Sequence, residues 1–164
     1  MDHLVCAASD LVRHGMTGAG IPLTAHLEHY LSVTVARFMA APLNPDRLTL
    51  RILRAFDAAA RPPELRHLAD ECLLAVSLFE DRLRRTGGSL RHYCGLGQAS
   101  YEAAGLPEQA CGFCHMRDVL VAACGSKAAD PARLVDAARA GSGVARRALA
   151  ECGVIPFPGR PRFS

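Results

Sequence analysis

The chain has 164 residues, enough for one domain that buries a continuous core without disulfides or a structural metal. Half of the residues are hydrophobic, but six phenylalanines, three tyrosines and no tryptophan leave the core to aliphatic side chains, which favours helices over sandwiches and barrels. The formal net charge is +3 and the arginines alternate with acids, so the sequence predicts solvated helix faces and no nucleic-acid partner.

The amino-terminal residues predict no secretory signal, because acids such as Asp2 and Asp10 stand where a basic start and an unbroken apolar stretch would be needed. The longest apolar runs, such as residues 119–124, are far shorter than the roughly 20 residues of a membrane span. We therefore expect a cytoplasmic protein without a membrane partner. Its seven cysteines are then expected as free thiols.

Caps, prolines and glycines predict four helices in the first half of the chain. Their ranges are 1–14, 24–40, 45–60 and 63–86. The first is expected to end at the glycine-rich residues 15–20, and Thr24 is a good N-cap for the second. Asn44-Pro45-Asp46 predicts the start of the third helix, because it supplies a cap, a first-turn proline and an acid near the positive helix end.

The second half contains signals for four more helices. Two are predicted over residues 90–104 and 107–125, and two more begin at Asp130 and Ser142. Three prolines within residues 154–164 prevent a regular helix there. No alternating apolar pattern predicts a strand, and short connections favour antiparallel neighbours. We expect an all-α, compact single-domain bundle of seven to eight helices over residues 1–153, followed by a Pro/Arg-rich extended tail over 154–164.

The middle of the chain resembles an uncharacterised family of bacterial helical proteins over roughly residues 30–104. The matching positions are Tyr30-Leu31, Ala36-Arg37-Phe38, the segment 68–84, and Tyr93, Gly97 and Tyr101. His92 stands where the family has an aromatic residue. The resemblance implies an α-helical fold and brings no activity with it.

The segment Cys111-Gly112-Phe113-Cys114-His115 carries the most suggestive chemistry. These five residues match the c-type haem attachment motif. Haem is attached covalently outside the cytoplasm, however, and no secretory signal is predicted here. On a helix, Cys111, Cys114 and His115 would be expected within reach of one zinc ion. A fourth zinc ligand would come from a neighbouring helix, with candidates Cys94, Cys124, Cys152, His92 or the pair His26 and His29.

Two further interpretations of this segment need no metal. A Cys-x-x-Cys pair at a helix start can lower a thiol pKa and support redox exchange. Alternatively, Cys111 and Cys114 are buried as small hydrophobes and resist modification until the protein unfolds, which is the interpretation we favour.

Other motifs are less specific. The glycines of Gly95-Leu96-Gly97 follow no strand, so they predict close helix packing and no dinucleotide loop. Asp70-Glu71 and Glu80-Asp81 are interpreted as exposed helix positions, and no catalytic residue is predicted.

These observations predict a non-enzymatic helical interaction or accessory protein. It would contact a protein partner through helix faces and the tail residues Gly159 to Ser164. The alternative is a zinc-binding or thiol-redox bundle that uses Cys111, Cys114 and His115.

Overall fold

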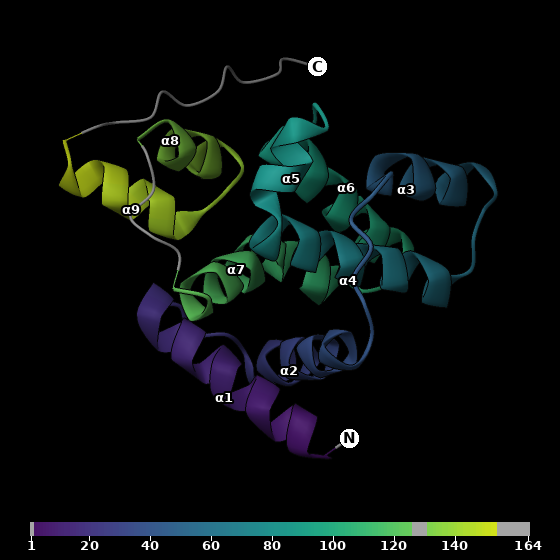
Figure 1. Ribbon diagram of the computed structural model, residues 1–164, viewed down its shortest axis with the longest axis horizontal. Helices are drawn as coiled ribbons and strands as arrows, with labels where there is room; N and C mark the ends of the chain where they lie inside the picture. Colours follow the sequence, from purple (N-terminus) through teal and green to yellow (C-terminus); the bar gives the residue numbers. More distant parts are fainter. Residues whose placement is uncertain (1, 126–130, 154–164) are drawn as a thin grey trace.

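The computed structural model describes residues 2–125 and 131–153, and every regular element in those ranges is an α-helix (Figure 1). The elements are α1 (Asp2–Ala19), α2 (Ala25–Ala40), α3 (Leu48–Asp57), α4 (Pro62–Leu78), α5 (Glu80–Arg85), α6 (Leu90–Ala103), α7 (Pro107–Ala123), α8 (Pro131–Arg139) and α9 (Gly143–Glu151). The all-α class is confirmed, with nine helices in the described residues where seven to eight were predicted. The predicted tail over 154–164 lies outside the described residues.

Hydroxyl caps fix the starts of three helices as the sequence predicted. The side chains of Thr24, Ser89 and Ser142 accept hydrogen bonds from the backbone N–H groups of Leu27, His92 and Ala145. Each bond satisfies one of the donors that a helix start leaves without an intrahelical partner. These starts therefore depend on local chemistry that the sequence shows directly.

The first helix runs five residues further than predicted. It continues through Gly15 and Gly18 to Ala19, because these glycines face α7. A Cβ at Gly15 would collide with the carbonyl oxygen of Val119, so only glycine allows α1 to approach α7 this closely. The expected end at residue 14 is wrong, because Gly15 and Gly18 serve packing. The last glycine of the segment, Gly20, does end the helix, with a left-handed φ of 63°.

The third helix begins later than predicted. Asn44 Oδ1 accepts a 3.0 Å hydrogen bond from the backbone N–H of Asp46, which makes an Asx turn in place of a helix start. Arg47 then has a left-handed backbone with φ of 53°, and α3 starts at Leu48. The predicted range 45–60 is therefore too long at both ends.

The predicted long helix over 63–86 is two helices. Phe79 leaves helical geometry, with φ of −126° and ψ of 29°, and separates α4 from α5. No proline or glycine marks this point in the sequence. The break directs Glu80 toward Arg117 of α7, 3.0 Å away.

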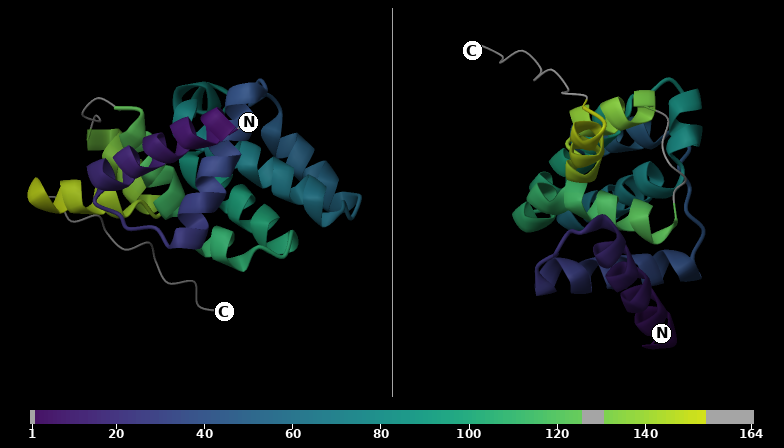
Figure 2. Two further views of the ribbon diagram at one scale, coloured as in Figure 1. Left: turned by 90° about the horizontal axis from the view of Figure 1, so that it is seen from below. Right: turned by 90° about the vertical axis from the view of Figure 1, so that its left-hand side faces the viewer.

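The helices pack around α4 and α7. α4 lies against α6 and α7. α1 and α2 lie on one side of α7, and the pair α8–α9 lies on the opposite side of α7 (Figures 1 and 2). α3 lies across one end of this arrangement against α4 and α6. Completely buried side chains at its centre include Leu31, Leu73, Tyr101, Phe113 and Met116. α8 and α9 add a small cluster of their own around Leu149.

None of the described helices has the length and apolar character that crossing a membrane requires.

We expect Gly15→Ala to lower the free energy of unfolding by about 1–3 kcal/mol, because the added methyl group forces α1 away from Val119. Gly18→Ala is a matched control in the same helix, since its Cβ would lie 3.6 Å from Ala122 Cβ, an ordinary contact. That variant should keep or raise stability, by up to about 1 kcal/mol. Denaturant unfolding measures both, and an equal effect of the two substitutions would contradict the close approach.

Candidate functional site

A buried carboxylate joins three helices. Asp70 on α4 has no exposed surface, and its Oδ1 accepts hydrogen bonds from the hydroxyls of Tyr30 on α2, at 2.6 Å, and Tyr101 on α6, at 2.8 Å. Its Oδ2 accepts a 3.3 Å hydrogen bond from Arg37 Nη1 and lies 3.9 Å from Arg66 Nε. The expectation that Asp70 and Glu71 are exposed is wrong, because α4 is buried on nearly all sides.

The aromatic rings around Asp70 reinforce this connection. Tyr30 and Tyr101 meet edge to face at 6.0 Å between centroids, and Tyr101 meets Phe113 of α7 in the same way at 6.1 Å. The guanidinium of Arg66 lies 4.9 Å from the centre of the Tyr30 ring. Burial raises the pKa of Asp70, while the two tyrosines, Arg37 and Arg66 oppose that rise by favouring the charged form.

Glu71, one residue further on, anchors a second set of side chains. Its Oε2 accepts a hydrogen bond from Arg51 of α3, and its Oε1 lies 3.8 Å from His67 Nε2. Arg51 also donates to the carbonyl oxygen of Asn44, at 3.0 Å. The other ring nitrogen of His67 lies 3.3 Å from Arg37, so the two acid-centred sets are connected. Glu71 thus holds α3 against α4.

The acids lie below the surface and the bases reach it. The side chains of Asp70 and Glu71 are 0% and 6% exposed, whereas those of Arg37, Arg51 and His67 are 36%, 34% and 51% exposed. Each carboxylate therefore fixes an arginine whose outer edge faces solvent, Arg37 for Asp70 and Arg51 for Glu71. At the surface, the outer side of each ion pair is therefore a guanidinium, with the carboxylate beneath it.

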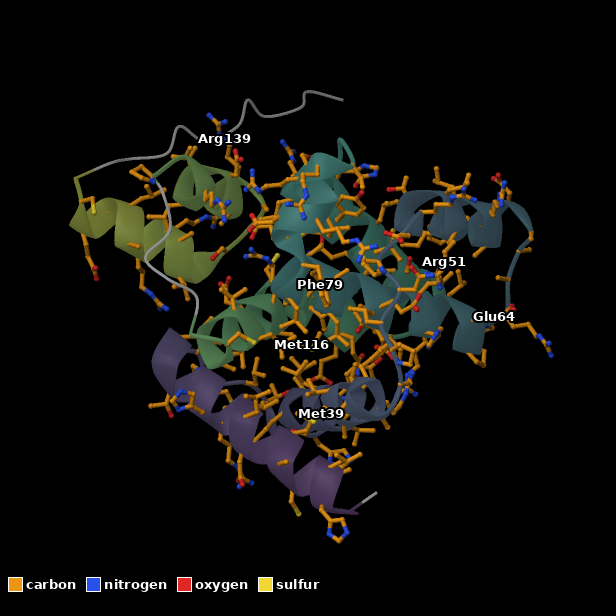
Figure 3. The ribbon with its side chains drawn as sticks, viewed as in Figure 1. Met39, Arg51, Glu64, Phe79, Met116 and Arg139 are labelled. Atoms are coloured by element: carbon orange, nitrogen blue, oxygen red, sulfur yellow. The ribbon has the colours of Figure 1, made fainter. Side chains whose placement is uncertain are left out.

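A groove of about 700 Å³ opens beside these cations between α3 and α4. Its apolar lining consists of Ala55, Ala58, Ala60, Pro63 and Leu68. Its charged lining consists of Arg51, Arg54, Glu64 and His67. Figure 3 shows Arg51 and Glu64 on this side of the molecule. Small side chains on the floor leave room for larger apolar side chains of a ligand.

Two leucines project from α3 next to the groove. Leu50 and Leu53 are 42% and 46% exposed, although α3 buries Leu48 and Ile52 against the core. Leu50 lies one turn before Arg54, so the leucines and the groove are neighbouring faces of one helix. We call the leucines and the groove lining together the α3–α4 face. It combines exposed apolar area with charged side chains of both signs, among them Arg54 and Glu64.

A second ionic network lies at the other end of α4. Arg117 of α7 is 5% exposed and donates to Glu80, which also accepts from Arg84 at 2.7 Å. Arg84 continues to Asp136 of α8, at 2.9 Å. The expectation that Glu80 is an exposed position is wrong, because it joins α5 to α7. This network connects α8 to α5 and α7.

The segment predicted to carry metal or redox chemistry is not assembled into one site. Cys111 and His115 are exposed on α7, whereas Cys114 is half-buried and donates to the carbonyl oxygen of Ala140, at 3.3 Å. Across residues 2–125 and 131–153, no three His, Cys, Asp or Glu side chains are grouped to hold a metal ion. His26, a candidate fourth ligand, instead lies 2.5 Å from Glu108.

Cys114 and Cys94 also lack the environment that activates cysteine. Burial raises the pKa of Cys114, and the nearby charge of Asp118 raises it further. Burial raises the pKa of Cys94 to about 12. A raised pKa keeps these thiols protonated, which is the opposite of what redox exchange requires. The expectation that Cys111 and Cys114 are both buried is wrong for Cys111, which is exposed on α7.

The two glycines of Gly95-Leu96-Gly97 have different roles. A Cβ at Gly97 would collide with the ring of Phe113, so this glycine lets α6 approach α7 as predicted. Gly95 is exposed and has no atom near the position of a Cβ. The close-packing prediction is therefore confirmed for Gly97 and wrong for Gly95.

Sequence reasoning missed Asp70 and Glu71, although a signal was present. They interrupt a run that is otherwise apolar over residues 68–76. Such a run predicts a helix buried on all sides, and a carboxylate inside it must find partners. Tyr30, Arg37 and Tyr101 were already noted as positions of the bacterial resemblance, and the structure shows that all three contact Asp70.

We expect Asp70→Ala to lower the free energy of unfolding by about 3–5 kcal/mol, because it leaves two buried hydroxyls without an acceptor and removes the partner of Arg37. Asp70→Asn keeps an acceptor oxygen for the tyrosines and should cost less. Exposed Asp10 on α1 supplies the control variant Asp10→Ala, which should change stability by less than about 0.5 kcal/mol. Equal effects of Asp70→Ala and Asp10→Ala in urea unfolding would contradict the connecting role.

We expect the thiols to react in the order of their burial. Exposed Cys111 should react with a thiol reagent in the folded protein, Cys114 should react more slowly, and Cys72 and Cys94 should react only after unfolding. Mass spectrometry of peptides from timed labelling assigns each rate. Rapid labelling of Cys72 in the folded protein would contradict its placement in the core.

No protein-family model, curated protein or solved structure matches the chain, so the resemblance to a bacterial helical family stays a prediction.

Proposed function

We propose that the chain is a non-enzymatic helical interaction protein, an accessory subunit that binds a protein partner through its α3–α4 face. The observation that carries this proposal is the exposure of Leu50 and Leu53 beside a groove with an apolar floor. Exposed apolar area that adjoins a groove and is flanked by charge is typical of protein-binding surfaces. A partner that covers the leucines would remove their apolar area from water.

The buried charges support the same proposal. Asp70 and Glu71 are enclosed by partners from this chain, so neither carboxylate is available to act on a bound substrate. Their role is to hold α2, α3, α4 and α6 in fixed positions. A binding surface gains affinity when it is already rigid before the partner arrives, because less freedom is lost on association.

The test is affinity capture from an extract of the producing cells with the full chain. The double variant Leu50→Ser/Leu53→Ser should lose a bound partner by about tenfold or more, because the apolar contact is replaced by hydroxyls. Met39→Ser is the matched control, since Met39 is 49% exposed on α2, away from Arg51 in Figure 3. It should retain the partner.

Both variants must keep the melting temperature of the unmodified protein within a few degrees, so that lost binding is not lost folding. A partner that both variants capture equally well would contradict the α3–α4 face as the binding surface.

A further inference from the structure

We propose that the α8–α9 pair is a lid that detaches from the rest of the protein as one unit and uncovers Cys114 and Asp118 on α7. The pair and the α3–α4 face lie at opposite ends of the molecule in Figure 1, so the lid is separate from the proposed binding surface. The proposal follows from how the pair is attached, which is mainly through polar contacts and small side chains.

The α8–α9 pair has an apolar cluster of its own. Ala138, Ala145 and Leu149 form this cluster, which is separate from the main core. Among the described residues, the apolar side chains of the pair that pack against the main core are Ala137, Ala140 and Val144. Because these side chains are small, docking of the pair removes little apolar area from water. Elements with few buried apolar contacts open at a lower free energy than the core around them.

Ion pairs and hydrogen bonds tie the pair to its neighbours. Arg84 of α5 donates to Asp136 of α8 at 2.9 Å, and Arg133 of α8 lies 2.8 Å from Asp81 of α5. All four of these side chains are partly exposed, so water competes for both ion pairs. Arg147 of α9 donates to a backbone carbonyl at the end of α1, at 2.8 Å. Contacts of this polar kind are typical of units that move relative to one another.

The pair covers polar groups of α7. Asp118 is 4% exposed, and its Oδ2 accepts a long hydrogen bond of 3.4 Å from the backbone N–H of Val144 at the start of α9. Cys114 donates to the carbonyl oxygen of Ala140 at 3.3 Å. Opening returns the carboxylate of Asp118 to water, and this hydration offsets part of the cost of detachment.

Gly141 allows the pair to lie close to Cys114. It connects α8 to α9 with a φ of 106°, and a Cβ at this position would lie 2.8 Å from Cys114 Sγ. Gly141→Ala therefore hinders docking in two ways, by backbone strain and by collision with the thiol. A reagent that bonds to Cys114 Sγ would meet the same backbone, so labelling of Cys114 reports opening of the lid.

The test measures iodoacetamide labelling of Cys114 and Cys72 in the full chain, at urea concentrations below the unfolding transition, by mass spectrometry of peptides. Cys72 has no exposed surface, so its labelling reports unfolding of the main core. Gly141→Ala is compared with the matched control Gly105→Ala. Gly105 lies between α6 and α7 with a φ of 74°, and no atom lies within 4 Å of its Cβ position. Exposed Cys111 reports the reactivity of the reagent.

We expect Gly141→Ala to raise the labelling rate of Cys114 about tenfold or more and to change that of Cys72 by less than about twofold. Gly105→Ala strains the main core, so it should raise the rate of Cys72 about fivefold or more and change that of Cys114 by less than about twofold.

A second pair of variants tests the ion pairs. Asp136→Ala removes the contact with Arg84 and should raise the labelling rate of Cys114 about two- to fivefold. Asp46→Ala is its matched control, because Asp46 also accepts from an arginine of α5, Arg82, but lies outside the α8–α9 pair. It should leave the rate of Cys114 unchanged.

Two outcomes would overturn the lid. A joint rise of Cys114 and Cys72 in Gly141→Ala, including a variant that does not fold at all, would show that α8 and α9 unfold only together with the main core. An unchanged rate of Cys114 in both Gly141→Ala and Asp136→Ala would show that the reagent reaches this thiol while the pair is docked.

Discussion

The hydrogen-bonded carboxylate of Asp70 is the interaction on which the arrangement of the helices depends. Removing a carboxylate from water is costly unless donors replace the lost hydration, and here Tyr30 of α2 and Tyr101 of α6 supply them. Apolar side chains can slide past one another at little cost, whereas these hydrogen bonds require one relative position of α2, α4 and α6. Asp70 thus restricts a core of otherwise adaptable aliphatic residues to one packing.

The same constraint shapes the surface. Arg37 reaches Asp70 from the protein surface, and Arg51 reaches Glu71 in the same way from α3. Because Glu71 is buried and Arg51 is partly exposed, the α3–α4 face presents a positioned guanidinium next to apolar side chains. Burial of charge, which adds little net stability, therefore defines the surface that we assign to partner binding.

Close helix contacts depend on glycines whose neighbours lie far along the chain. Gly15 of α1 lies against Val119, Gly97 of α6 lies against Phe113, and Gly112 lies against Leu27 of α2. All three contacts involve α7, which explains how one helix can lie against α1, α2 and α6. Glycine costs helix propensity at each position, and closer packing around α7 offsets that cost.

The sequence by itself determined the helical class and most helix boundaries, because caps, prolines and terminal glycines act on neighbouring residues. Thr24 and Ser89, for example, cap the helices that they were predicted to cap. Only the tertiary structure decided the burial of Asp70, the break at Phe79 and the difference in burial between Cys111 and Cys114. Each of these depends on side chains from helices distant in the sequence. The sequence around a helical carboxylate does not reveal whether water or two tyrosines surround it. Only the packing of the helices determines which of the two environments the carboxylate has.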